Sequence, residues 1–132
     1  AVIYKEGLSG ATMEDCVFCQ IVQGEKKADF VYQDDSVVAF NDVSPQAPVH
    51  VLLVPRKHIR SLNDIEEGDR SVVSELIFGA HKVAEDFGIA RTGYKLIFNV
   101  ERGGGQYVFH LHLHLLGGWQ EGTHLRLKDI VG

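Results

Sequence analysis

The stretch that decides the fold is YVFHLHLHLLGG, residues 107–118, in which histidine and leucine alternate. The three histidines are His110, His112 and His114. Successive side chains of a β-strand point to opposite faces of the sheet, so the imidazoles share one face and the leucines share the other. We therefore predict a strand whose leucine face is buried in the core. Its histidine face then lines a cleft, a metal site or a polar surface.

Four further apolar runs in the chain are typical of strands. They cover residues 29–33, 36–42, 50–55 and 94–100. Asp34 and Asp35 lie between the first two runs and favour a turn, so these two strands are predicted to form a hairpin. Together with the histidine strand, they predict five strands in a meander-like order.

Two segments show patterns typical of helices. Residues 14–25 predict a short helix. Between residues 64 and 87, apolar side chains recur at intervals of three and four, which predicts one long helix with a single buried stripe. The stripe consists of Val72, Val73, Leu76, Ile77, Ala80, Val83, Ala84 and Phe87. Asn63 or Asp64 is placed to cap the start of this helix, and Gly88 is placed to end it.

These elements predict an α+β domain with a mainly antiparallel five-stranded sheet, one long helix and one short helix. The chain of 132 residues is long enough for one domain, which we place at residues 14–132. Residues 1–13 are expected to be an extension outside it, either disordered or added for expression.

Composition excludes several classes of partner. The formal net charge of −5 argues against nucleic acid and against a membrane surface, because both require a basic face. No apolar run approaches the roughly 18 residues of a membrane span, and the first residues lack the pattern of a secretory signal. The CVFC motif at residues 16–19 therefore suggests a redox pair or half of a zinc site in a reducing compartment, which we take to be the cytoplasm.

The histidine face has three interpretations. It is a polar surface, a hydrolytic zinc site that uses two or three of the imidazoles, or a site of nucleophilic and acid–base chemistry. The residues just upstream favour the last interpretation. Gly103, Gly104 and Gly105 allow the backbone to approach an anion closely, and Gln106 adds a neutral hydrogen-bond donor.

GGGQ and VFHLHLHLLGG, separated by Tyr107, resemble the signature His-φ-His-φ-His-φ-φ of the histidine triad (HIT) family, where φ is apolar. The segments FCQI (18–21), AFND (39–42) and VSPQAPVHVLLVPRKH (43–58) are similar to the Hint branch of that family, and the resemblance covers residues 14–118. It implies a HIT-like fold and the activity of a nucleotide hydrolase or transferase. It also implies a homodimer with a sheet that continues across the pair, for which we expect the long helix and the strand at 94–100 to form the contacts.

The resemblance implies a role for each residue near the phosphate. His112 would attack the α-phosphorus to form a nucleotidyl-histidine, which water then hydrolyses. His114 or His110 would supply the proton for the leaving group. Gln106 and the backbone amides from Gly105 to Val108 would hold the non-bridging oxygens. Tyr107 stands where many relatives have serine, which leaves the choice of leaving group open.

Further positions resemble the family's nucleoside site. Asp42 would accept hydrogen bonds from the ribose hydroxyls, and a turn-capping role is the alternative. The slot for the base would consist of Phe18, Ile21, Phe40, Val43 and Leu52. Each of them alone is better explained as core, and only their joint match to the family favours the slot. Asn99 would orient Gly105 or a phosphate oxygen, unless it simply bonds a neighbouring loop.

The CxxC pair provides two of the four ligands of a structural zinc site. The candidates that complete the site with Cys16 and Cys19 are His50 and His110, an arrangement that resembles the zinc site of many bacterial histidine triad proteins. Two buried reduced thiols are the alternative. The remaining histidines, which we expect at the surface or in loops, are His58, His81 and His124.

The function implied by the resemblance is cleavage of a purine nucleoside 5′-phosphoramidate to AMP and a free amine. Three alternatives stay open: a dinucleoside polyphosphate hydrolase of the same fold, a zinc hydrolase that uses metal-bound water, and a regulator that binds a nucleotide without turnover. The physiological substrate and the role of the C-terminal tail are not predicted.

Overall fold

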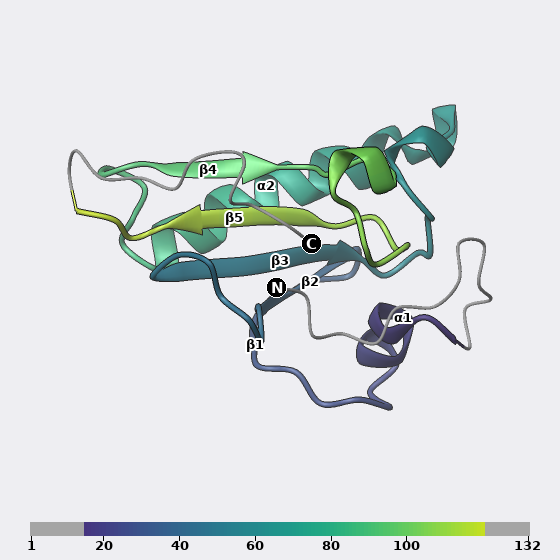
Figure 1. Cartoon of the computed structure of the whole chain (residues 1–132), viewed down its shortest axis with the longest axis horizontal. Coiled ribbons are helices and arrows are strands. Elements are labelled where there is room, and N and C mark those ends of the chain that lie inside the picture. Colours follow the sequence, from purple (N-terminus) through teal and green to yellow (C-terminus); the bar gives the residue numbers. More distant parts are fainter. Residues whose placement is uncertain (1–14, 121–132) are drawn as a thin grey trace.

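The computed structural model describes residues 15–120 and shows one antiparallel sheet with a long helix on one face (Figure 1). The sheet order is β1-β2-β3-β5-β4. The strands are β1 Phe30–Gln33, β2 Val37–Asn41, β3 Val49–Pro55, β4 Tyr94–Ile97 and β5 Leu113–Gly117. The helices are α1 Val17–Val22 and α2 Arg70–Asp86, with short 3-10 turns η2 Leu62–Asp64, η3 Glu67–Asp69 and η4 Arg102–Gly104. The predicted α+β class and antiparallel sheet are confirmed.

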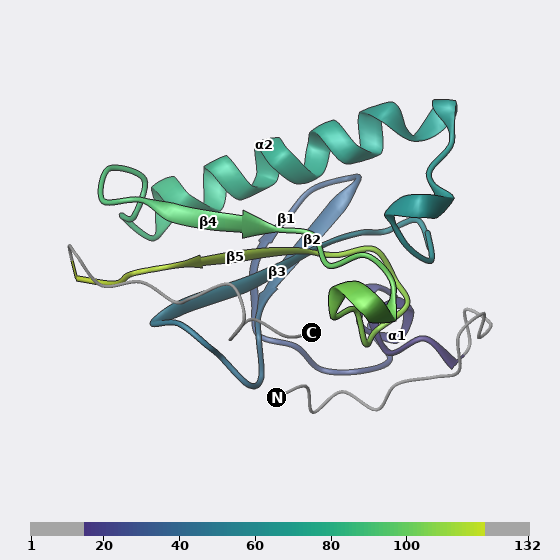
Figure 2. The same cartoon turned by 45° about the horizontal axis from the view of Figure 1, so that its top comes forward.

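Each face of the sheet has its own core. Figure 2 shows α2 running along one face, and the buried residues there include Leu53 of β3 and Leu113 of β5. At Gly79 the helix comes so near the sheet that an added Cβ would lie 3.2 Å from the Leu53 side chain. The opposite face packs against α1, where Phe18 contacts Phe40 of β2 with ring centroids 5.5 Å apart. All three histidines of the motif are buried away from the α2 core.

The register of the central strands places the histidines. β3 pairs antiparallel with β5, so that Leu52 lies opposite His114 and His50 lies opposite Leu116. His50 and His114 therefore point to the same face of neighbouring strands. The apolar residues that alternate with these histidines and face the α2 core set this register, because a shift of one position would turn the leucines out of the core.

Two predictions about element boundaries are wrong. The last strand begins at Leu113 rather than residue 107, so His110 and His112 precede it, although Leu111 is still buried in the α2 core. The long helix begins at Arg70, with Asp69 as its N-cap, because the expected caps Asn63 and Asp64 belong to the separate turn η2.

The buried stripe of α2 is narrower than predicted. Its fully buried positions are Leu76, Gly79, Ala80, Val83 and Ala84, while Ile77 and Phe87 are exposed. Within residues 15–120, no helix is long and apolar enough to cross a membrane. The predicted extension at residues 1–13 and the predicted surface residue His124 lie outside the described residues.

Candidate functional site

Two groups of buried side chains surround the histidine motif. The first, which we call the Cys–His cluster, consists of Cys16, Cys19, His58 and His110. The second, which we call the Asp–His cluster, consists of Asp42, His50 and His114. Within each cluster, the possible ligand atoms all lie within 4.8 Å of one another. His112 lies between them in the sequence and belongs to neither.

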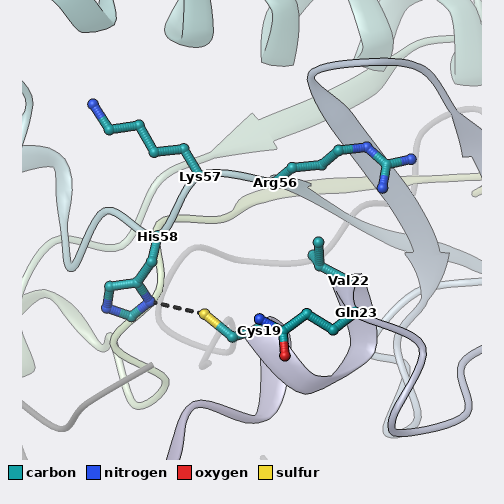
Figure 3. Close-up of a pocket in the computed structure, with 6 residues that line it drawn as sticks. All are labelled: Cys19, Val22, Gln23, Arg56, Lys57 and His58. Carbon is teal, nitrogen blue, oxygen red and sulfur yellow. Dashed lines mark hydrogen bonds between the residues drawn. The ribbon is translucent and has the colours of Figure 1, made fainter. Parts of the chain in front are cut away.

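The Cys–His cluster joins α1 to two loops. Cys16 is the N-cap of α1 and Cys19 lies in its first turn, so the helix brings both sulfurs to one side. The Nδ1 atom of His110 lies 3.4 Å from Cys16 Sγ and 3.5 Å from Cys19 Sγ. His58 Nδ1 lies 3.2 Å from Cys19 Sγ, the contact drawn in Figure 3, and 3.2 Å from His110 Nδ1.

These separations fit a tetrahedral zinc ion. With Zn–S bonds of about 2.3 Å and Zn–N bonds of about 2.0–2.1 Å, tetrahedral ligands lie about 3.5 Å apart for sulfur and nitrogen and about 3.3 Å apart for two nitrogens. The observed sulfur–nitrogen distances of 3.2–3.5 Å and the nitrogen–nitrogen distance of 3.2 Å agree with those values. The four side chains therefore form a closed ligand set.

Protonation at the cluster also suits a metal. The His110 Nε2 atom lies 2.8 Å from the backbone oxygen of Pro55, which can only accept, so Nε2 carries the proton and Nδ1 has the lone pair. Burial lowers the pKa of His110 to about 3 and also lowers the pKa of His58, so both rings are neutral at pH 7. Burial, followed by the neighbouring Cys16, raises the pKa of Cys19 to about 12. A bound cation would displace that proton.

The fourth member of the cluster is His58, not the predicted His50. His50 lies near the start of β3 and His58 three residues beyond its end, so only His58 is at the same end as α1. His58 lies in the loop after β3, as predicted, but its place in the cluster was missed. His81 is 60% exposed on α2, as predicted. The sequence places His58 three residues after Pro55, which ends the strand, but only the structure shows that this end of β3 packs beside α1.

A cavity of about 350 Å³ opens beside this cluster. It is lined by Cys19, Val22, Gln23, Arg56, Lys57 and His58. Figure 3 shows Lys57 and Arg56 directed away from the contact between Cys19 and His58. The Cys19–His58 edge of the cluster therefore borders this cavity.

In the Asp–His cluster, different ring nitrogens donate and accept hydrogen bonds. The backbone N–H of Gln46 donates to His50 Nδ1 over 3.1 Å, so the proton of neutral His50 must be on Nε2. That Nε2 lies 2.9 Å from His114 Nδ1 and 3.4 Å from Asp42 Oδ2. His114 Nδ1 is therefore an acceptor, and neutral His114 carries its own proton on Nε2.

This order excludes metal binding at His50 in the present geometry. A cation would need the lone pair of His50 Nε2, which would move the proton to Nδ1 and place it against the N–H of Gln46. Burial lowers the pKa of His50, which disfavours the doubly protonated ring as well. The cluster is therefore suited to fixing the tautomer of His114.

His112 is oriented by the backbone of its own segment. Its Nδ1 lies 2.7 Å from the carbonyl oxygen of His110, so Nδ1 carries the proton and the lone pair is on Nε2. The Phe18 ring meets the His112 ring edge-on at a centroid distance of 5.2 Å, and the His114 ring lies 5.1 Å away. A neutral imidazole held in this way presents one nitrogen as a nucleophile.

The predicted nucleoside residues lie on the same face as His112. Phe18, Phe40 and Leu52 are buried there together, as is Ile21 of α1, whereas Val43 is 52% exposed. One Asp42 oxygen accepts the backbone N–H of Ser44 over 2.8 Å, which is the turn-capping alternative. The other oxygen points to His50. A role for Asp42 with ribose stays a prediction.

The glycine loop departs from expectation at Gln106. The side chain is buried, its two amide hydrogens donate to the carbonyls of Arg60 and Val108, and its oxygen accepts the N–H of Glu101. Gln106 thus shapes the loop and has no amide hydrogen to offer a phosphate. Gly105 has a φ of 89°, a conformation that glycine adopts freely. The Asn99 side chain lies beside Gly105, which it was predicted to orient, and this role stays a prediction. Tyr107 is 38% exposed.

Known proteins share this sequence and architecture. The family model "HIT domain" matches residues 23–121. A purine nucleoside phosphoramidase of Escherichia coli (strain K12) is 45% identical over 117 residues, which cover 89% of this chain and 98% of that protein. Among solved structures, a HIT family hydrolase from Clostridium thermocellum is 45% identical with a TM-score of 0.81, covering 87% of this chain and all of its own.

A zinc-bound histidine triad family protein from Mycobacterium smegmatis is also similar, at 26% identity and a TM-score of 0.73 over 84% of this chain and 80% of that one. The matched family model spans most of the described residues, including the histidine motif and both of its flanking loops. The chain therefore belongs to the histidine triad (HIT) family.

Proposed function

We propose that this protein hydrolyses purine nucleoside 5′-phosphoramidates, with His112 as the nucleophile. The observation that carries the proposal is the 2.7 Å contact between His112 Nδ1 and the His110 carbonyl, which leaves the lone pair on Nε2. The 45% identity to the phosphoramidase of E. coli supports the substrate class, since the match covers nearly all of both chains.

The reaction proceeds in two displacements. In the first, His112 Nε2 bonds to the α-phosphorus, and the P–N bond breaks with its electron pair on the nitrogen, which takes up a proton from water and leaves as the amine. In the second, a water oxygen bonds to phosphorus, the P–Nε2 bond returns its pair to His112, and the water releases a proton. AMP leaves, and the proton released balances the one consumed.

The other side chains stabilise charge around these steps. His114 would donate a hydrogen bond from its Nε2–H to the departing nitrogen or a phosphate oxygen. His110 cannot share this task because its Nε2–H donates to the carbonyl of Pro55. Of the backbone amides from Gly105 to Val108, those of Gly105 and Gln106 donate to the carbonyls of Arg102 and Glu101, so the amides of Tyr107 and Val108 would hold the non-bridging oxygens. The ribose would lie at Asp42 and the base in the slot that includes Phe18 and the exposed Val43.

Intact-mass measurement tests this proposal. Denaturation at alkaline pH after brief exposure to adenosine 5′-phosphoramidate is expected to show a protein heavier by one AMP group, because the P–N bond of a nucleotidyl-histidine hydrolyses in acid. The adduct should vanish in His112→Ala and persist in His81→Ala, a matched change at an exposed histidine. A wild-type protein that turns over this substrate without an adduct would disprove covalent catalysis. Faster turnover of a dinucleoside polyphosphate would reassign the substrate.

We further infer that the Cys–His cluster holds a structural zinc ion. Its four ligands are Cys16, Cys19, His58 and His110, and the zinc-bound relative from M. smegmatis supports the choice of metal. When bound, zinc would supply a cross-link between α1 and the histidine segment, and a closed ligand set leaves it no open position for catalytic water. Elemental analysis should find one zinc per chain, and His58→Ala should lose it while His50→Ala should not.

We also infer a homodimer in the cytoplasm. β4 is an edge strand, and exposed apolar side chains lie on it and on α2: Leu96, Ile77 and Phe78, the last 69% exposed. Such a surface favours pairing of two copies. The two reduced cysteines suit a reducing compartment. Sedimentation at micromolar concentration should show a dimer, and Phe78→Glu should weaken it; a monomeric wild type would refute this inference.

A further inference from the structure

The glycine loop begins at a residue in an unfavourable backbone conformation. Glu101 has a φ of 62°, and it is the one non-glycine residue with positive φ in the stretch from 15 to 120. A side chain with a Cβ is strained in this region, which glycine enters freely. Such strain persists only where surrounding contacts enforce it, and it concentrates at functional sites.

The Glu101 side chain is held by hydrogen bonds from several side chains. Arg60 donates to both carboxylate oxygens, over 2.6 and 2.9 Å, and Ser61 Oγ donates over 2.6 Å. Bidentate pairing with arginine is the strongest form of this interaction. The bonds from Arg60, then that from Ser61, lower the pKa of Glu101 to about 2, so the carboxylate stays charged at neutral pH. Ser61 itself is fully buried.

The Glu101 backbone closes the loop. Its N–H donates to the side-chain oxygen of Gln106 over 2.8 Å, and its carbonyl accepts the N–H groups of Gly104 and Gln106, both over 3.0 Å. The Gln106 amide in turn donates to the carbonyl of Arg60. The loop is thus tied to Arg60 twice, once through the Glu101 carboxylate and once through Gln106.

The segment that holds Glu101 also contacts the histidine motif. Arg60 lies over the Phe109 ring at 4.5 Å, and the carbonyl of Ile59 accepts the N–H of Leu111 over 2.7 Å. Residues 59–61 therefore form a common support for the loop on one side and the residues around His110 on the other. Movement of the Glu101 anchor would shift the loop amides relative to His112.

We propose that Glu101 is a positioning residue: its carboxylate, clamped by Arg60 and Ser61, forces the left-handed backbone that closes the glycine loop and aims the amides that follow it, those of Tyr107 and Val108, at the phosphate attacked by His112. This inference rests on the proposed function. The charge of Arg60 also offsets that of the carboxylate, which would otherwise repel an anionic substrate near the loop.

Substitutions at position 101 separate the clamp from the backbone conformation. Glu101→Ala removes the clamp and keeps the strain, so the loop should relax and the rate of nucleotidyl-histidine formation in a single turnover should fall about tenfold to a hundredfold. Glu101→Gly also lacks the clamp, but it adopts the left-handed conformation without strain and should recover part of that rate. Glu67→Ala, which breaks an exposed ion pair with Arg70, should have no effect.

Three results would overturn the proposal. They are a rate in Glu101→Ala within twofold of wild type, equal losses in the alanine and glycine variants, and a loss fully explained by the unfolded fraction measured by circular dichroism. Should Glu101→Ala fail to fold, Arg60→Met provides the same test from the other side of the clamp. The double variant Arg60→Met/Glu101→Gly should then be no slower than Arg60→Met alone, because one clamp is lost in both.

A second measurement keeps this inference separate from the proposed function. If wild type forms no adduct with a phosphoramidate, the proposed function fails, but the loop can still be tested with AMP. The amide ¹H–¹⁵N signals of Tyr107 and Val108 should shift on addition of AMP in wild type and in Glu67→Ala, and shift less in Glu101→Ala. Equal shifts in all three proteins would show that Glu101 does not aim these amides.

Discussion

The Cys–His cluster and the Asp–His cluster contain the same kind of residue and have opposite capacities. His110 donates a hydrogen bond from Nε2 to the Pro55 carbonyl, so the lone pair on its Nδ1 faces the sulfurs of Cys16 and Cys19 and the ring of His58. His50 accepts a hydrogen bond at Nδ1 from the backbone N–H of Gln46, so the proton on its Nε2 faces His114. The Pro55 carbonyl therefore leaves His110 able to bind a metal, whereas the Gln46 amide makes His50 a hydrogen-bond donor to His114.

The largest expected effect is on stability, at the Cys–His cluster. Cys19→Ala removes one of four ligands that join α1 to the histidine segment, so bound zinc and its contribution to folding should be lost. We expect the melting temperature to fall by at least about 10 °C, equivalent to several kcal/mol. Differential scanning calorimetry measures this, and a chelator should lower the melting temperature of wild type toward that of Cys19→Ala.

A chelator that lowers the melting temperature of Cys19→Ala by the same amount as that of wild type would contradict this expectation. Glu25→Ala, at an exposed residue just beyond α1, is the matched control and should keep both the metal and the melting temperature of wild type.

The second prediction compares one histidine substitution in each cluster. His50→Ala should keep zinc at one per chain and lower kcat by about a hundredfold, because His114 loses the hydrogen bond that fixes its tautomer. His58→Ala should do the reverse at the metal, with zinc lost. Elemental analysis and steady-state kinetics on the same samples measure both. Loss of zinc in His50→Ala would show that His50 is a metal ligand and would contradict the distinction between the clusters.

The division between the clusters shows where sequence reasoning succeeds. The alternation of leucine and histidine was predicted and holds even before β5 begins at Leu113, because burial of Leu111 in the α2 core enforces it. The proximity of Cys16 and Cys19 to His110 was likewise predicted and is found, although His110 lies 94 residues from Cys16. The first inference depends on local periodicity, whereas the second depends on the resemblance to the family's zinc site.

What sequence reasoning missed depends on contacts between distant residues. His50 and His58 lie at opposite ends of the β3 segment, and the choice between them follows from which end α1 packs against. The tautomers of His110 and His114 depend on partners far away in the chain: Pro55 is 55 residues from His110, and His50 is 64 residues from His114. The strained Glu101 is likewise held by Arg60, 41 residues away. No local pattern encodes these pairs.

The smallest expected effect is a pH dependence of stability that belongs to the Asp–His cluster. Burial lowers the pKa of His50 below its ordinary value of 6.5, so in acid the unfolded chain binds a proton that the folded chain refuses. The free energy of unfolding should therefore decrease as the pH falls from 6.5 toward the lowered pKa, by at most about 1.4 kcal/mol per pH unit for this group. Urea denaturation of wild type and His50→Gln between pH 5 and 7.5 measures the difference. The slope should be shallower in His50→Gln, because glutamine does not titrate, and an identical slope in the two proteins would show that His50 is protonated equally in the folded and unfolded states.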